Sequence, residues 1–289
     1  MYYDEDELLD LRLNILDEYV DKFIITESKF THSGKVKSKN FRIENFNKFQ
    51  KKIEYFYIEN EPKNLKKVQD GDSEEELNNK KIYNGLLRDN YQRECLSQGI
   101  KKLNNEDIII LSDLDEIPNF EDVNFKNIKK DILLFEQKMF YYKLNLLYPR
   151  LLWYGTKACR KKSFFSPQWL RNIKAKKYPL WRIDTLFSKK KYSNIQIIKN
   201  GGWHFTNMKN PKNLHKKMKE FAHHPEYEET KYSEKDMEKF IKNKLVFYDH
   251  FSDKNKNRFD SKNKLEKVGE NILPKYLGKN LKKYKNWID

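Results

Sequence analysis

The chain opens with one amphipathic segment followed by two short apolar runs. Within residues 4–19, large apolar side chains recur at helical spacing, and acidic residues crowd the first turn, where the helix dipole favours them. The apolar positions of this segment are Leu8, Leu11, Ile15 and Tyr19. Residues 21–28 and 51–59 are apolar runs bounded by polar residues, which is typical of buried strands. The pattern predicts a helix followed by two strands.

A longer helix is predicted after Ser73. Ser73 and Glu76 form the S-x-x-E pattern of a capping box, in which each side chain bonds the backbone N–H of the other residue. From there to about Leu103, apolar side chains fall on roughly one face, as in an amphipathic helix. These side chains are Tyr83, Leu86, Leu87, Cys95, Leu96 and Ile100.

Three more strand regions are predicted beyond residue 105. They are EDIIILSDLDEIP at residues 106–118, DILLFEQKMFYYKLN at 131–145, and NIQIIKNGGWHF at 194–205. After Pro211 the pattern is mainly helical, with lysine-rich polar faces. Because strands alternate with helices of crossover length, we expect an α/β fold with a mostly parallel sheet that helices cover on both faces.

The composition fits a globular protein with a strongly basic balance. The chain has 289 residues, of which 59 are Lys or Arg and 43 are Asp or Glu, so its formal net charge is +16. Aromatic residues make up 15%, which argues against a disordered chain. The mean hydropathy is −0.98. No apolar run approaches the ~18 residues that a transmembrane helix needs.

Several features predict a cytoplasmic protein of one main domain. The acidic first residues lack the apolar core of a secretory signal. Cys95 and Cys159 lie far apart without metal-type spacing, so we expect reduced thiols rather than a disulfide. We expect the main domain to fill residues 1–250, and residues 251–289 to form a lysine-rich helical extension packed on it.

The positive charge is concentrated in residues 150–200, which hold fourteen basic residues and one acidic residue, Asp184. Aromatic residues such as Phe164, Phe165 and Trp169 are interleaved with these charges. Such a segment forms either a solvated basic face or a surface for an anionic ligand. That ligand could be a nucleotide pyrophosphate, a nucleic acid or an acidic membrane, and the sequence leaves these alternatives open.

The chemically most informative feature is LSDLDEIP, residues 111–118. An apolar run delivers Asp113, Asp115 and Glu116 to the carboxyl end of a predicted buried strand, where ligands bind in open α/β sheets. Asp113 and Asp115 project to one side of an extended chain, and their oxygens suit Mg²⁺ or Mn²⁺. Three carboxylates in four residues repel one another unless a cation lies among them. The alternative is a polar strand end with helix-capping acids.

Two enzyme classes use a D-x-D motif of this kind. In phosphatases of the haloacid-dehalogenase type, the motif follows the first strand and has Thr or Val at its fifth position. Here the motif lies more than a hundred residues into the chain, and its fifth position is Ile117. Nucleotide-sugar glycosyltransferases of the GT-A fold carry the motif mid-domain, after a nucleotide-binding half. The placement favours the glycosyltransferase.

The chain as a whole resembles glycosyltransferase family 17, the family of β-1,4-mannosyl-glycoprotein β-1,4-N-acetylglucosaminyltransferase. The resemblance rests on the order and spacing of DELLDLRLNILDEYVDKFIITESKFTHSGKVK, LRDNYQRECLSQGI, DIIILSDLDEIP, GGWHFTNM, KMKEFAHHPEY and LPKYLGKN. It implies a GT-A-like, Rossmann-like fold and an inverting transferase. It also implies a UDP-sugar donor, with UDP-GlcNAc as the first candidate, a glycan or other hydroxyl acceptor, and a divalent cofactor, Mn²⁺ or Mg²⁺.

The resemblance also implies roles for individual residues. Asp113 would contact the donor's ribose or the metal, Asp115 would ligate the metal, and His204 would be a third ligand that suits Mn²⁺. The implied donor-binding residues are Glu27, Arg88, Arg93, Asp113 and Trp203. Because Arg88 and Arg93 point about 140° apart on a helix, we expect only one of them to face the donor, and we favour Arg93.

No motif identifies the general base. An inverting displacement needs a carboxylate that takes the proton of the acceptor hydroxyl. Asp184 is the single acid of the basic segment, Glu116 adjoins the predicted metal pair, and Glu220 is the third candidate. The competing hypothesis is a protein that only binds nucleic acid or an anionic membrane. The sequence contains no nucleic-acid-binding motif that would support binding of nucleic acid. A peripheral contact with a membrane is compatible with an enzyme as well as with a protein that only binds.

Overall fold

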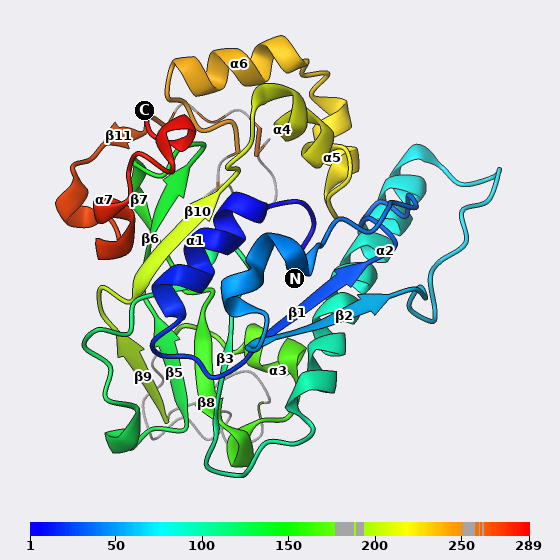
Figure 1. Ribbon diagram of the computed structural model, residues 1–289. Coiled ribbons are helices and arrows are strands. Elements are labelled where there is room, and N and C mark those ends of the chain that lie inside the picture. The colour runs from blue at the N-terminus through cyan, green and yellow to red at the C-terminus, as the bar shows by residue number, and fades with distance from the viewer. Residues whose placement is uncertain (177–187, 189–193, 249, 251–257, 260, 262) are drawn as a thin grey trace.

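The computed structural model describes residues 1–176, 188, 194–248, 250, 258–259, 261 and 263–289. Asp184 therefore lies outside the described residues. Figure 1 shows strands running through the centre of the molecule with helices around them. Among the described residues, no helix is both long and apolar enough to cross a membrane.

The N-terminal quarter of the chain follows the predicted pattern. Helix α1 spans Asp6–Leu16 and buries its leucines, and strands β1 (Phe23–Ser28) and β2 (Ile53–Ile58) follow. The two strands pair in parallel, from Phe23 opposite Ile53 to Ser28 opposite Ile58. A 3₁₀ segment, η1 (Ile43–Phe49), lies in the connection between them. The helix and the two strands predicted here are confirmed.

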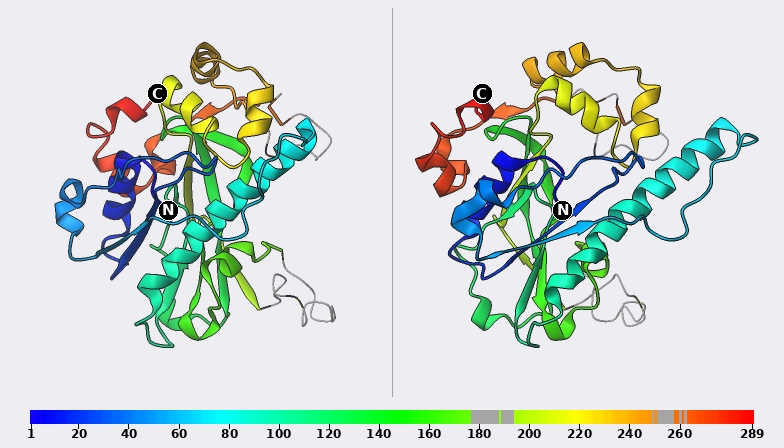
Figure 2. Two further views of the ribbon diagram at one scale, coloured as in Figure 1. Left: turned by 90° about the vertical axis from the view of Figure 1, so that its right-hand side faces the viewer. Right: turned by 45° about the vertical axis from the view of Figure 1, so that its right-hand side comes forward.

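The long helix α2 spans Glu74–Glu94 and begins with the predicted capping box between Ser73 and Glu76. Its apolar positions are not its buried face, because Tyr83 and Leu86 are each 41% exposed. The side chains that α2 buries include Gln92 and Arg93. Gln92 donates to the Thr26 carbonyl of β1. This helix therefore packs on β1 through polar contacts rather than through an apolar stripe. Figure 2 shows α2 running alongside the β1–β2 pair.

The remaining strands form two sheets. The four-stranded sheet has the order β3-β8-β5-β9, with β3 at Ile108–Leu111, β5 at Ile132–Phe135, β8 at Lys157–Arg160 and β9 at Ile195–Ile198. The five-stranded sheet has the order β11-β7-β6-β10-β4. Its strands are β4 (Glu116–Pro118), β6 (Gln137–Tyr141), β7 (Leu146–Trp153), β10 (Gly202–Thr206) and β11 (Glu266–Lys267).

The α/β class is confirmed, but the prediction of a mostly parallel sheet is wrong. Only the pairings β1–β2, β5–β9 and β6–β10 are parallel among the described strands, and the other five are antiparallel. The reason lies between Ile132 and Arg160, where β5, β6, β7 and β8 follow one another without a helix. Parallel neighbours need a crossover of a dozen or more residues, whereas short connections such as that between β6 and β7 allow antiparallel pairing.

The other helices are short. They are α3 (Pro167–Asn172), α4 (Pro211–Met218), α5 (His224–Glu229), α6 (Glu234–Lys242) and α7 (Lys275–Lys279). Single 3₁₀ turns include η2 (Cys95–Ile100), η3 (Phe125–Asn127), η4 (Lys161–Ser163), η6 (Glu270–Ile272) and η7 (Lys285–Trp287). Helices α4 to α6 gather at one end of the molecule, which is the upper end in Figure 1.

The C-terminal segment is packed into the same apolar cluster as the N-terminal helix. Leu273, Leu277 and Tyr284 are buried in a cluster that also contains the leucines of α1 and Ile117 and Phe205 near the D-x-D motif. The two ends of the chain therefore contribute to one core beside that motif.

Leu277→Ala tests this packing. Leu277 is fully buried, so its truncation should cost about 2–5 kcal/mol in the free energy of unfolding. The unfolding transition, followed in denaturant by circular dichroism, should shift as a single step. Lys279→Ala on the same helix removes an exposed side chain and should change stability by no more than about 0.5 kcal/mol. Equal midpoints for Leu277→Ala and the wild type would mean that α7 is not part of the core.

Candidate active site

The loop of the D-x-D motif joins the end of β3 to the start of β4. It turns tightly, with the Glu116 N–H donating to the Asp113 carbonyl at 3.1 Å. Arg12 of α1 holds both sides of the turn: its guanidinium donates to the Ser112 hydroxyl at 2.5 Å and to the carbonyls of Glu116 at 2.6 Å and Asp113 at 3.2 Å. A buried strand and a helix thus fix the loop that carries the three carboxylates.

Glu116 points inward and all its contacts are within the protein. It is 1% exposed and accepts from the Trp153 indole N–H at 2.6 Å, from Arg171 at 2.8 Å and from the Asp113 N–H at 2.9 Å. Gly155 packs against it so closely that a Cβ there would lie 1.7 Å from Oε1. The Glu116 carboxylate therefore shapes the loop and has no exposed oxygen.

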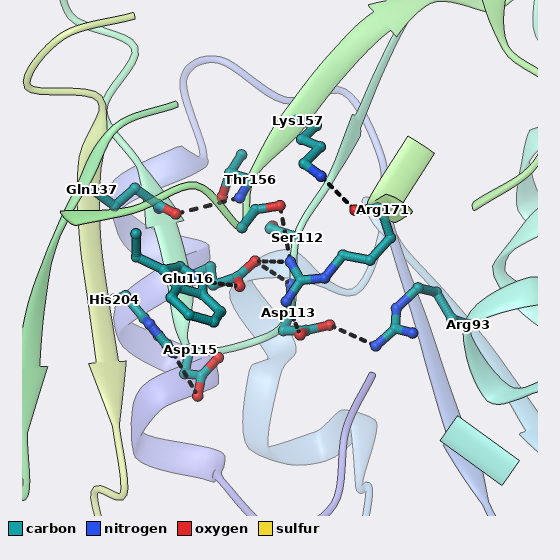
Figure 3. A network of polar contacts seen from close by, with 12 residues as sticks. Arg93, Ser112, Asp113, Asp115, Glu116, Gln137, Thr156, Lys157, Arg171 and His204 are labelled. Atoms are coloured by element: carbon teal, nitrogen blue, oxygen red, sulfur yellow. Dashed lines mark hydrogen bonds and ion pairs between the residues drawn. The ribbon is translucent and has the colours of Figure 1, made fainter. Parts of the chain in front are cut away.

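Asp113 lies between two arginines, as Figure 3 shows. One carboxylate oxygen is 2.7 Å from Arg171 of α3, and the other is 3.4 Å from Arg93 of α2. Burial alone would raise the pKa of Asp113, but the two guanidinium groups outweigh it and hold that pKa well below its usual range. Arg93, which we favoured over Arg88 as the arginine facing the donor, contacts the motif carboxylate.

Arg171 is the contact that sequence reasoning missed. It bridges Asp113 and Glu116 and also donates to the Gly155 carbonyl at 2.9 Å. Lys157 of β8 donates to the carbonyls of Arg171 and Ile173 and so fixes the end of α3. Burial, together with the charge of Arg171, lowers the pKa of Lys157 to about 7. The available signal was indirect: Arg171 lies in the basic segment, and the three carboxylates need compensating charge.

Asp115 lies next to His204 of β10. Oδ2 of Asp115 is 3.4 Å from Nε2 of His204, and the Phe205 N–H donates to the Asp115 carbonyl at 2.8 Å. The pairing of β10 with β4 sets this position, because His204 stands opposite Glu116 in the ladder. The Trp153 ring covers the imidazole, with ring centroids 5.0 Å apart. Burial alone would raise the pKa of Asp115, but His204 and the charge of Lys217 together outweigh it, so the pKa lies below its ordinary value.

In the glycine pair before His204, Gly202 lies against the neighbouring strand β4. Gly202 has φ +132°, a backbone conformation that side chains disfavour, and a Cβ there would lie 2.2 Å from the Ile117 carbonyl of β4. The pair therefore allows β10 to lie close to β4, which brings His204 to Asp115.

Asp113 and Asp115 both line a cavity of about 240 Å³. Its wall includes cationic and acidic groups and aromatic rings from segments far apart in the sequence. Among them are Tyr3, His32, Lys37, Asp89, Lys209, Lys217, Glu220 and Phe221. The cavity wall thus combines carboxylates with lysine side chains, and Asp113 and Asp115 are among its carboxylates.

Other predicted site residues lie elsewhere. Glu27 is fully buried and accepts from the N–H groups of Asn40 and Phe41 and from the Tyr55 hydroxyl, besides pairing with Lys37. Its carboxylate thus anchors the segment after β1 and is not among the residues lining the cavity.

Arg88 and Trp203 also point away from the motif. Arg88 pairs with Glu61 at 2.6 Å and donates to the His32 carbonyl at 3.2 Å. The Trp203 indole N–H donates to the Ile272 carbonyl at 2.7 Å, because successive residues of β10 face opposite sides of the sheet. Of the base candidates, Glu220 lines the cavity and accepts from the Tyr3 hydroxyl, whereas Glu116 does not line it.

The carboxylates suit a divalent cation that arrives with a phosphate ligand. Among the described residues, no three His, Cys, Asp or Glu side chains form a ready cluster for a metal. Mg²⁺-type sites, however, are commonly built from one or two carboxylates, with water and substrate phosphates completing the shell. Asp113 and Asp115 offer such oxygens at the cavity wall. Nδ1 of His204 is buried without a hydrogen-bond partner, so this ring holds Asp115 through Nε2 alone.

Comparison with known proteins identifies relatives of the chain. The sequence model of glycosyltransferase family 17 matches residues 1–288. The human and rat proteins named β-1,4-mannosyl-glycoprotein 4-β-N-acetylglucosaminyltransferase are each 30% identical to the chain over 129 residues. This alignment covers 42% of the chain and 21% of each relative, so the match spans about a fifth of their length. No solved structure matches the chain significantly.

Arg171→Gln tests the role of this side chain in holding the motif. Removing one partner of a partly buried ion pair should cost about 2–3 kcal/mol in the free energy of unfolding at pH 7. Because the pKa of Asp113 is depressed in the folded protein, the pair stabilises the fold above the unfolded pKa of about 3.9, and that stability is lost as the pH falls below it. The loss in Arg171→Gln should therefore shrink between pH 7 and pH 3.

Denaturant unfolding at both pH values gives the comparison. Arg160→Gln is the matched control, because Arg160 pairs with the exposed Glu106 and its removal should cost about 0–1 kcal/mol. A loss for Arg171→Gln that is equally large at pH 3 would show that its charge does not act on Asp113.

Proposed function

The chain belongs to glycosyltransferase family 17, and we propose that it transfers a sugar from a UDP-sugar to a hydroxyl group of a glycan acceptor. UDP-GlcNAc is the proposed donor, since the relatives are named as N-acetylglucosaminyltransferases. The observation that carries the proposal is the position of Asp113 and Asp115, which line the same cavity at the carboxyl end of β3. Family membership does not favour the D-x-D phosphatase or the protein that only binds nucleic acid or a membrane.

The cavity supplies charges for a nucleoside diphosphate. Lys217 of α4 lies on its wall, and its charge helps to lower the pKa values of Glu5 and Asp115. Lys37 and Lys209 line the cavity while paired to Glu27 and Asp4. These cations stand where phosphate oxygens of a donor would need compensation.

We assign the proposed cofactor, Mn²⁺ or Mg²⁺, to Asp115 and Asp113. Bound there, the cation would neutralise the departing diphosphate as a Lewis acid. The protein's own groups prepare the site: His204 orients the Asp115 carboxylate, and Arg93 and Arg171 hold Asp113 ionised. Glu116 stabilises the loop by accepting a hydrogen bond from the Asp113 N–H. The resemblance implied that Glu27, Arg88 and Trp203 bind the donor. In this proposal they would instead support the cavity from outside it.

In an inverting reaction the acceptor hydroxyl must lose its proton to a carboxylate as it attacks the donor sugar. Glu220 is our proposed base, because this residue of the segment after α4 lines the same cavity as Asp113 and Asp115. The Tyr3 hydroxyl donates to Glu220 and orients it. Asp184 is the alternative from the basic segment.

A thermal-shift panel tests the proposed function directly. UDP, UDP-GlcNAc, UDP-Gal, UDP-Glc and GDP-Man would each be added with Mn²⁺ and with EDTA. A ligand at a hundred times its Kd stabilises the folded protein by about 2.7 kcal/mol, which is a readily measured shift. We expect UDP and UDP-GlcNAc to raise the melting temperature with Mn²⁺ only. Shifts that persist in EDTA, or none with any nucleotide, would refute the proposed metal-dependent donor site.

Asp115→Asn tests whether the D-x-D motif binds the metal. Asn keeps nearly the same volume but removes the charge that pairs with His204, so the melting temperature without metal should stay the same or fall slightly. The Mn²⁺-dependent shift with UDP should vanish, and transfer to acceptor should fall by orders of magnitude. Asp122→Asn, which changes an exposed acid after β4, should leave both intact. A destabilised Asp115→Asn protein that still binds Mn²⁺ and UDP would end this assignment of the motif.

A further inference from the structure

Three loops rich in basic residues lie at one end of the four-stranded sheet. In its register, Ile108 of β3 stands opposite Arg160 of β8, and Ile132 of β5 stands opposite Cys159 and Ile195. The segments before β3, before β5 and after β8 therefore meet at the same end, which is the lower end in Figure 1. We call residues 101–107, 124–131 and 160–166 the basic end. The D-x-D loop leaves β3 at the opposite end of the sheet, after Leu111.

The basic end has a large excess of exposed positive charge. Its three segments contain eight basic and three acidic residues. Among the acids, Glu106 is paired with Arg160 at 3.3 Å and Lys162 at 2.8 Å. The lysines exposed to solvent are Lys101, Lys102, Lys126, Lys129, Lys130 and Lys162. They come from separate loops and form a surface only because the sheet brings those loops together.

An aromatic side chain projects from the same surface. Phe165 is 76% exposed, the largest exposed fraction among the exposed apolar side chains of the described residues. It follows η4 directly and contacts the Trp169 ring edge-on, with centroids 4.9 Å apart. The adjoining Phe164 lies under the Lys161 ammonium at 5.8 Å. An exposed ring held among lysines is the arrangement by which peripheral proteins enter the headgroup region of a bilayer.

An apolar cavity of about 890 Å³ adjoins this surface. It lies between the β1–β2 pair and β3, and its lining includes Lys101, Lys102 and Phe164 of the basic end. Most of the other lining residues are apolar and come from α1, β1, β2, η2, β3 and the loops beside them, with Arg12, Glu54 and Gln98 among the polar exceptions. A mainly apolar wall next to lysines suits the acyl chain of a lipid better than a nucleic acid, which binds through phosphate contacts and base stacking.

We propose that the basic end binds the surface of an anionic lipid bilayer. The lysines of its three loops would attract the lipid phosphates, and Phe165 would enter the interface between headgroups and acyl chains. The D-x-D cavity would then lie at the end of the sheet away from the bilayer. This inference is independent of the donor, since it requires only the fold and the composition of the three loops.

Vesicle sedimentation tests the proposal on the full chain. Vesicles of phosphatidylcholine alone and of phosphatidylcholine with one third phosphatidylglycerol would be compared at low and high salt. We expect binding to the anionic vesicles only, and release at high salt, because salt screens exposed charges. Each lysine neutralised near an anionic surface weakens partitioning about fivefold, so Lys101→Gln with Lys102→Gln should weaken it about 25-fold. Phe165→Ser should weaken the binding at low salt as well, because the ring no longer enters the interface.

Matched variants at other sites provide the control. Lys235→Gln with Lys242→Gln changes two lysines of α6, at the other end of the molecule, and Val68→Ser changes another exposed apolar residue. Both should bind vesicles as the wild type does, and all variants should keep the wild-type melting temperature. Equal binding to neutral vesicles, or equal losses in the control variants, would overturn the proposal. Salt-sensitive binding to a DNA duplex that Phe165→Ser leaves unchanged, without binding to anionic vesicles, would identify a nucleic-acid surface instead.

Discussion

The loop that carries three carboxylates within four residues is held at one strand end by three arginines, and the arrangement of the site depends on these contacts. Helices α1, α2 and α3 each contribute one of them: Arg12 binds the backbone of the motif turn, while Arg93 and Arg171 bind its side chains. Without these cations, the motif carboxylates would repel one another. Helices that are distant in the sequence are thus brought to the same loop by charge as well as by apolar packing.

This constraint explains features of the fold that an apolar core alone would not require. Helix α2 buries polar side chains because its inward face carries Gln92 and Arg93 to β1 and the motif. Strand β10 approaches β4 through Gly202, and that approach places His204 on Asp115. The Glu116 carboxylate is buried and stabilises the loop, whereas Asp113 and Asp115 line the cavity. The same local sequence therefore provides both a structural anchor and the groups available to a ligand.

The sequence predicted the local parts of this arrangement and missed the distant ones. Periodicity and capping located α1, α2 and the strand that delivers the motif. Arg171 could not be found this way, because its contacts with the motif span more than fifty residues and leave no periodic trace. The resemblance implied that Glu27 binds the donor, yet its carboxylate accepts from the backbone N–H groups of Asn40 and Phe41 in the following segment. Strand direction was also misjudged, since it depends on connections that contain no helix.

The most direct test is a crystal structure of the protein grown with Mn²⁺ and UDP, with anomalous diffraction recorded at the manganese edge. The account predicts one strong anomalous peak at the cavity, bound by an Asp115 oxygen and by the diphosphate, with the imidazole of His204 beside it. Arg93 and Arg171 should stay within contact of Asp113. A UDP molecule bound at this cavity without a manganese peak, or a manganese peak on a different face of the protein, would contradict it.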